Sequence, residues 1–181
     1  MIREKRVKDL MKPVNTCPSV YPDATLDQTL TAIVSSHDSK FALVTEHGKV
    51  VGMVGPEEIF ETIHQGKLKN KYYRGWNLSN WSSPVYMEGL FTEMCKTASA
   101  KRVHEIMRPI MEPLKPDDTL YKAIDVFQKK PNGYAPVMDR GQVIGIISSN
   151  EILEEIKSVV SKERRRGAQT GPSEAASAAG I

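Results

Sequence analysis

The stretch Val7-Lys-Asp-Leu-Met-Lys-Pro13 returns later in the chain as Val103-His-Glu-Ile-Met-Arg-Pro109, at an offset of 96 residues. Two further stretches return in the same order, at offsets of 94 and 93 residues: Pro22-Asp-Ala-Thr-Leu26 as Pro116-Asp-Asp-Thr-Leu120, and Gly48-Lys-Val-Val-Gly-Met-Val54 as Gly141-Gln-Val-Ile-Gly-Ile-Ile147. A repeat of this period indicates two copies of one structural unit. Each copy alone buries little surface, so the two should pack on each other, with a cleft for a small ligand between them.

Both copies have the same predicted order of elements. A short opening segment ends at its proline, and an extended piece follows. The Pro-Asp-x-Thr turn supplies helix N-cap residues, and the helix behind it has apolar residues at helical spacing, such as Leu26, Leu30 and Ile33. Two apolar strands joined by a polar turn that ends in glycine predict a hairpin. A second helix closes each copy. The predicted fold class is therefore mixed α/β (α+β), with two β-α-β-β-α repeats.

The chain divides into four predicted segments: a first repeat (1–64), a connection (65–101), a second repeat (102–161) and a disordered tail (162–181). The connection holds both tryptophans and a predicted helix that starts at Ser83-Pro84. That helix is expected to cover an edge of the module, to bury a dimer interface, or to dock a partner. The tail is rich in glycine, serine and alanine, a composition that favours disorder.

Composition and charge narrow the function classes. The formal net charge of +3 gives no argument for nucleic acid as the main partner. The basic run Lys162–Arg166 is expected to be a solvated helix end, and contact with nucleic acid is the weaker alternative for it. With no apolar stretch long enough to span a bilayer and no signal-peptide pattern, a cytoplasmic protein without membrane contact is expected. The spacings of histidine and cysteine do not match a metal site. The sequence also contains no nucleophile–base pair and no P-loop, so no enzymatic activity is expected.

With these residues in view, the chain resembles the CBS-domain pair, the regulatory Bateman module. The resemblance rests on the V-x-[DE]-x-M-x-P opening, the P-D-x-T-L turn and a closing G-x-x-[ST]-x-x-[DE] motif, which follow one another twice. It implies two repeats packed about a pseudo-two-fold axis and assembly as a homodimer, and it does not cover the helical connection inserted between the repeats or the tail. It also implies an adenosine ligand in the cleft and a regulated partner protein. AMP, ADP or ATP (with Mg²⁺) rank ahead of S-adenosylmethionine or NAD, and no tightly bound cofactor is expected.

The closing motifs nominate the site. The second copy reads Gly145-Ile-Ile-Ser-Ser-Asn-Glu151, while the first reads Gly52-Met-Val-Gly-Pro-Glu-Glu58 and has lost the hydroxyl at Gly55. The resemblance implies that this hydroxyl and the acid hold phosphate and ribose. The favoured ribose and phosphate site comprises Gly145, Ser148, Glu151 and Arg108. The predicted base slot comprises Leu114, Tyr134, Ala135 and Pro136. The degraded second site comprises Gly52, Glu58, Lys12 and Val20.

Each candidate also has a structural interpretation. Ser148 and Glu151 form a capping-box pattern that needs no ligand, and Glu57 and Glu58 favour the start of a helix through its dipole. The base-slot residues fit an ordinary core, and isolated cations such as Lys12 are often simply solvated.

Two main functions therefore remain open from the sequence, ahead of a third and weaker one, nucleic-acid association through the basic tail. The first is an adenine-nucleotide sensor that acts through a partner. The second is a ligand-free dimerisation or scaffold module whose aromatic connection docks a partner.

Overall fold

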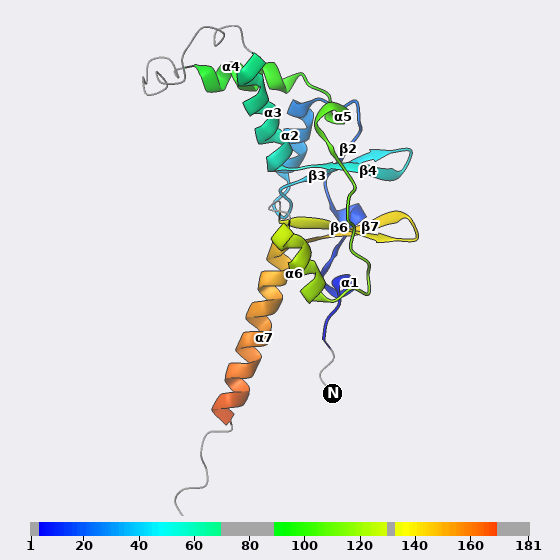
Figure 1. Cartoon of the computed structure of the whole chain (residues 1–181), viewed down its shortest axis with the longest axis vertical. Coiled ribbons are helices and arrows are strands. Elements are labelled where there is room, and N and C mark those ends of the chain that lie inside the picture. Colours follow the sequence, from blue (N-terminus) through cyan, green and yellow to red (C-terminus); the bar gives the residue numbers. More distant parts are fainter. Residues whose placement is uncertain (1–3, 70–88, 130–132, 170–181) are drawn as a thin grey trace, which may run out of the picture.

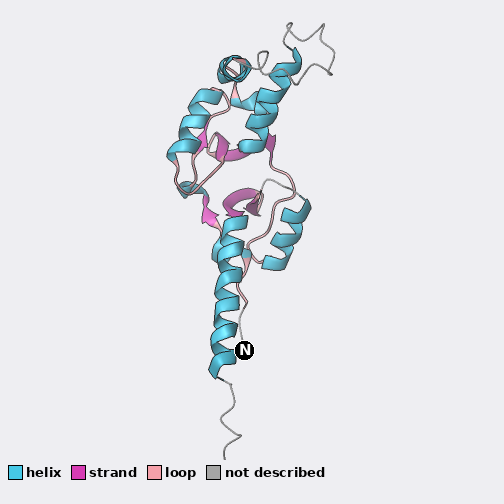
Figure 2. Ribbon diagram, turned by 90° about the vertical axis from the view of Figure 1, so that its left-hand side faces the viewer, coloured by secondary structure: helices cyan, strands magenta, loops and turns pink. Residues whose placement is uncertain are grey.

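The computed structural model describes residues 4–69, 89–129 and 133–169. Two lobes follow one another along the long axis of the molecule, and a long helix extends from the second lobe (Figure 1). The strands of both lobes lie in the middle, with helices on the outer sides (Figure 2). The mixed α/β fold class with two repeated units is thus confirmed.

The first lobe is built mainly from the first repeat. Its elements are β2 (Ser19–Val20), α2 (Leu26–Ser35), β3 (Ala42–Glu46), β4 (Lys49–Val54) and α3 (Pro56–Lys69). The short helix η1 (Val14–Thr16) precedes them and contacts β7 of the second lobe, at Gln142–Ser148. Helix α2 begins where the turn residues predicted, because the Thr25 hydroxyl accepts from the backbone N–H of Gln28, whose side chain accepts from the N–H of Thr25. The strands lie in the order β2-β3-β4-β5, where β5 (Arg108–Pro109) comes from the second repeat.

The second lobe repeats this arrangement. Its elements are α6 (Leu120–Lys129), β6 (Tyr134–Asp139), β7 (Gln142–Ser148) and α7 (Ser149–Gln169). Its strands lie in the order β1-β7-β6, where β1 (Lys12–Pro13) comes from the first repeat. Both predicted hairpins are confirmed, since β3 pairs with β4 and β6 with β7. The turns are His47-Gly48 and Arg140-Gly141, and all four residues have positive φ. A two-residue turn of this type matches the twist of the strands that it joins.

The opening segments are exchanged between the lobes. Helix α1 (Val7–Leu10) and strand β1 (Lys12–Pro13) belong to the first repeat, yet β1 pairs with β7 of the second. In the same way α5 (Val103–Ile106) leads into β5 (Arg108–Pro109), which pairs with β4 of the first. The N–H of Val7 donates to the Asp118 carbonyl at 3.0 Å, and that of Val103 to the Ala24 carbonyl at 2.9 Å. Each sheet therefore contains strands of both repeats.

Two glycines allow this exchange. A Cβ added at Gly52 would lie 2.9 Å from the Arg108 carbonyl oxygen, and one at Gly145 would lie 2.8 Å from that of Lys12. Both contacts are closer than real Cβ atoms tolerate. The repeated glycine of the last strand thus makes room for the backbone of the exchanged strand.

Three hydrophobic clusters follow the layers. One lies in the first lobe around Leu26, Val44 and Val103, and one in the second around Val7, Leu114 and Ile147. The third cluster joins side chains of both repeats: Cys17, Phe41, Leu43, Met53, Tyr134 and Ile146. This shared core is what small repeats need, because neither buries enough apolar surface alone.

Helix α4 (Leu90–Ser99) confirms the helical part of the connection from Leu90 onward. It packs against α3 and α2 through the buried side chains of Met94 and Ala98, while Phe91 stays exposed. The predicted start at Ser83-Pro84 and both tryptophans lie outside the described residues. The described part of the connection thus packs on the helices of the first lobe.

Helix α7 is longer than predicted. It continues through Gln169, so residues 162–169, for which disorder was predicted, are helical. Lysine, glutamate and arginine favour helix, and Glu163 forms an ion pair with Arg166 one turn later at 3.1 Å. The basic run Lys162–Arg166 therefore lies on an exposed helix end.

Candidate functional site

Two equivalent clusters of charged side chains, called here the first and the second cleft, lie where the exchanged strands meet the starts of α3 and α7. Each holds a carboxylate in the first turn of the closing helix: Glu58 in the first cleft and Glu151 in the second. Each carboxylate is faced by a cation from the opening segment of the other repeat, Arg108 and Lys12 respectively. The clefts are therefore built across the repeats.

In the first cleft the Glu58 side chain is buried among residues of both repeats. It is only 4% exposed. One carboxylate oxygen accepts from the backbone N–H of Gly55 at 2.8 Å and from the Tyr134 hydroxyl at 3.5 Å. The other lies 2.8 Å from Nε of Arg108, whose guanidinium also reaches Glu57 at 3.3 Å. Glu58 thus caps its helix and joins three elements.

The electrostatics of this cluster keep both neighbours of Glu58 protonated. Desolvation lowers the pKa of Arg108, but the charges of Glu58 and Glu57 outweigh it, so the pKa is raised. Burial raises the pKa of the Tyr134 hydroxyl, and the nearby Glu58 raises it further. At neutral pH Arg108 is therefore a cation, and the Tyr134 phenol keeps its proton and can donate it in a hydrogen bond.

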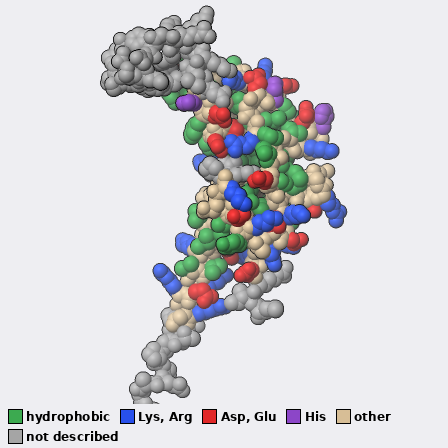
Figure 3. All heavy atoms as spheres, in the orientation of Figure 1, with side chains coloured by type: hydrophobic (Ala, Val, Ile, Leu, Met, Phe, Trp, Pro, Cys, Tyr) green, Lys and Arg blue, Asp and Glu red, His purple; other side chains and the backbone are tan. Residues whose placement is uncertain are grey.

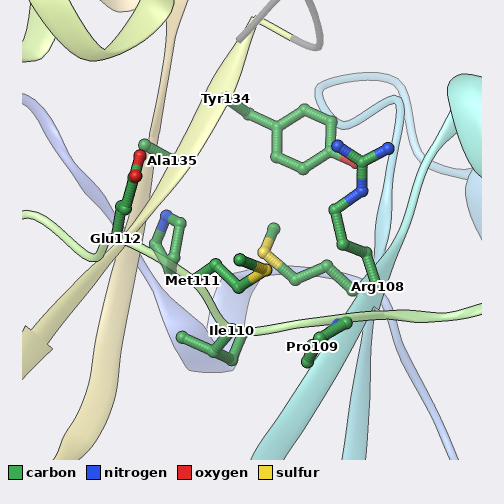
Figure 4. Close-up of a pocket in the computed structure, with 9 residues that line it drawn as sticks. Arg108, Pro109, Ile110, Met111, Glu112, Tyr134 and Ala135 are labelled. Carbon is green, nitrogen blue, oxygen red and sulfur yellow. The ribbon is translucent and has the colours of Figure 1, made fainter. Parts of the chain in front are cut away.

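A small pocket opens beside this cluster. Its lining is mostly apolar and comes from both repeats: Met53, Arg108, Pro109, Ile110, Met111, Glu112, Tyr134, Ala135 and Pro136. The Tyr134 ring and the Arg108 guanidinium lie at one side of it (Figure 4). The volume of this cavity is about 30 Å³, which is room for about two water molecules. A nucleotide would need these side chains to move.

In the second cleft the carboxylate is less deeply buried than in the first. Glu151 is 14% exposed and Lys12 34% exposed, and their charged atoms lie 3.3 Å apart. The backbone N–H of Ser148 donates to Glu151 at 2.7 Å, and the Ser148 hydroxyl also bonds the same carboxylate oxygen. The Lys12 ammonium donates to the Asp38 carbonyl at 3.0 Å as well. This cleft offers a hydroxyl, a carboxylate and a partly exposed cation.

The structure groups the candidate residues differently from the sequence. Arg108 was placed with Ser148 and Glu151 but contacts Glu57 and Glu58 instead. Lys12 was placed with Glu58 but contacts Glu151. The grouping by repeat was wrong because the opening segments are exchanged, which carries each cation to the opposite cleft.

The predicted base slot is divided in a similar way. Tyr134, Ala135 and Pro136 line the pocket beside Arg108. Leu114 is instead buried in the second-lobe core, and its backbone pairs with Pro136 and Met138. Val20 is paired to β3 and packs against the first-lobe core. Leu114 and Val20 therefore make the contacts of core residues, as their structural interpretation predicted.

The capping interpretation of the two acids is also visible. Glu58 and Glu151 each accept the N–H three residues earlier, from Gly55 and Ser148, as the acid of a capping box does. Ser148 differs from an ordinary capping serine in that its hydroxyl bonds the Glu151 carboxylate. Any ligand role for these acids would add to their capping role.

Two searches of the described residues are negative. No group of three or more histidine, cysteine, aspartate or glutamate side chains in residues 4–69, 89–129 and 133–169 could hold a metal ion. Within the same part of the chain, no helix has the length and apolar character to cross a membrane.

Solved structures with this fold include CBSX2, a CBS-pair protein from Arabidopsis thaliana, with a TM-score of 0.63 and 18% identity over 88% of this chain and 99% of that one. CBSX2 in complex with AMP gives a TM-score of 0.58 and 16% identity over 86% and 98%. The cytosolic domain of the Mg²⁺ channel MgtE in complex with ATP gives 0.54 and 16%, over 84% and 49%. At these identities the likeness shows the fold alone.

Sequence comparison decides the family. Comparison with curated protein sequences gives no match. A model of the CBS domain matches twice, over residues 7–65 and 103–158. These two regions cover most of the chain and coincide with the repeated unit, so the protein belongs to the CBS domain family and contains a tandem pair of CBS domains.

Proposed function

We propose that the protein is a regulatory module without catalytic activity that binds an adenine nucleotide of the AMP, ADP or ATP type. It would act in the cytoplasm through a partner protein. The observation that carries the proposal is the second cleft, where Lys12 of one repeat meets Ser148 and Glu151 of the other. The AMP and ATP complexes of structurally similar proteins support this ligand class.

The chemistry of the second cleft suits a nucleotide. The Lys12 ammonium and the start of α7 favour a phosphate, and the Glu151 carboxylate can accept both ribose hydroxyls. A ligand held there would contact both repeats, so its binding would favour one arrangement of the lobes. The signal to a partner is then limited by the difference in ligand affinity between the two arrangements.

A thermal-shift panel tests the proposal. AMP, ADP, ATP, S-adenosylmethionine and NAD are added with and without Mg²⁺, and at least one adenine nucleotide should raise the melting temperature. At about 100 times the dissociation constant the gain is roughly 2.7 kcal/mol, or about 5–10 °C for a chain of this size. Ser148→Ala and Glu151→Gln should weaken binding at least tenfold.

The matched controls are Ser161→Ala and Glu154→Gln, which make the same changes at exposed positions of α7. They should bind as the wild type does. No stabilisation by any ligand at millimolar concentration would contradict the sensor and favour the scaffold. The scaffold alternative is supported by the first cleft, where Glu58 is buried and bonded by Gly55, Tyr134 and Arg108.

We also propose a homodimer that uses the closing helices. Phe60 on α3 and Leu153 on α7 occupy equivalent positions in the two repeats and are 68% and 60% exposed. Hydrophobic side chains reach the surface of both lobes (Figure 3). Exposed apolar residues at matching positions suit a symmetric interface.

Phe60→Glu and Leu153→Glu should therefore each shift the protein from dimer to monomer in sedimentation velocity. Phe91→Glu, which alters an equally exposed residue on α4, should leave the dimer intact. A monomeric wild type at micromolar concentration would contradict this assembly.

A further inference from the structure

The first cleft has not simply lost a hydroxyl. Gly55 stands where the second repeat has Ser148, and a Cβ at Gly55 would lie 2.3 Å from the Tyr134 hydroxyl oxygen and 3.0 Å from two ring carbons. Tyr134 therefore occupies the space that a serine would need. Its hydroxyl reaches Glu58 from the other repeat, whereas in the second cleft the hydroxyl that bonds the acid belongs to Ser148 itself.

The position equivalent to Tyr134 shows the reciprocal difference. It is Phe41, which lacks the hydroxyl, and the two rings stack with centroids 4.8 Å apart and an interplanar angle of 30°. Both are buried in the shared core. The first cleft thus combines glycine with tyrosine, and the equivalent positions of the other repeat carry serine and phenylalanine. The two differences compensate each other.

The remaining contacts of the first cleft are also already made. The Glu58 carboxylate is held by Gly55, Tyr134 and Arg108, and the Arg108 guanidinium also holds Glu57. The groups that would bind ribose and phosphate therefore bind one another. In the second cleft Glu151 is likewise bonded by Ser148 and paired with Lys12, but its side chain is 14% exposed, against 4% for Glu58.

We infer that the contact between Tyr134 and Gly55 closes the first cleft to nucleotide and that the protein binds one nucleotide per chain, in the second cleft. Tyr134 is then the specificity-determining residue that makes the two clefts unequal. This inference rests on the proposed nucleotide binding and adds which cleft is used and why.

A double-mutant cycle tests the contact without any ligand. Gly55→Ser should lower the melting temperature by at least about 5 °C, because the new side chain meets a buried ring. Tyr134→Phe removes the hydroxyl and should change the melting temperature little. The double variant should recover at least half of the loss, since only the tight ring contacts remain. Strictly additive effects would overturn the contact.

Calorimetric titration with AMP tests the consequence. The wild type should bind one AMP per chain, and Gly55→Ser/Tyr134→Phe should bind two. The mirror-image variant Ser148→Gly/Phe41→Tyr should abolish binding while circular dichroism shows that it stays folded. Two AMP per wild-type chain, or unchanged binding in the mirror-image variant, would overturn the inference.

The two tests separate two kinds of failure. If the wild type binds none of AMP, ADP and ATP, the proposed function and the stoichiometry both fail, while the stability cycle still decides whether Tyr134 and Gly55 are coupled. If AMP binds at one site but Ser148→Ala leaves its affinity unchanged, nucleotide binding stands and the assignment to the second cleft is overturned.

Discussion

Replacing Val7 with alanine should loosen the second repeat, although Val7 lies in the first. Its side chain is fully buried in the cluster formed by Leu114, Ala135 and Ile147. Removing two methyl groups from a packed core costs about 2 kcal/mol, through lost burial and the cavity left behind. Hydrogen exchange should therefore show faster exchange of the β6 and β7 amides than in the wild type, with β3 and β4 less affected.

Val103→Ala is the matched variant. Val103 is buried in the first-lobe cluster with Leu26 and Val44. The same change at Val103 should therefore speed hydrogen exchange of the β3 and β4 amides and affect those of β6 and β7 less. Loss of protection in the repeat that contains the substituted residue would contradict the exchange of opening segments.

Of the two cations in the clefts, Arg108 should be the one whose replacement by methionine lowers the free energy of unfolding more. The replacement leaves the Glu58 carboxylate, 4% exposed, without its cation. Breaking a buried ion pair on one side typically costs 3–5 kcal/mol, and because Arg108 is partly exposed we expect about 3 kcal/mol. Urea unfolding of the folded chain measures the loss.

Lys12→Met is the control, because Lys12 is the repeat equivalent of Arg108. Its partner Glu151 is more exposed, lies at 3.3 Å and keeps both bonds from Ser148, so the loss should be about 1 kcal/mol or less. The double variant Arg108→Met/Glu58→Gln should be more stable than Arg108→Met, because no buried charge is left unpaired. Equal losses for the two single variants would show that the clefts do not differ as described.

Much of the fold could be predicted from local patterns. The T-x-x-Q capping box of α2 and the two hairpins are encoded within a few residues, because caps and tight turns depend on local backbone geometry. The repeat itself established that the elements occur twice. The end of α7 was predicted wrongly, because the composition of the tail outweighed the helix propensity of its charged run.

The site could be predicted only in part. The acids Glu58 and Glu151 were identified from the closing motifs, but their cations were assigned to the wrong clefts. A strand of two residues carries no signal for the sheet edge that it joins, since any edge offers the same backbone groups. One signal was present in the sequence: the repeats differ in hydroxyl at two aligned pairs, Gly55 with Ser148 and Phe41 with Tyr134.

The sequence by itself determined that the protein contains two copies of one unit and which family that unit belongs to. It did so because repeated turns, caps and apolar spacings are local and are preserved in order. Only the tertiary structure decided which cation faces which acid, and that Tyr134 fills the space above Gly55. These contacts join residues of different repeats, between 50 and 139 positions apart. They depend on how the two lobes pack, which no short stretch of the chain specifies.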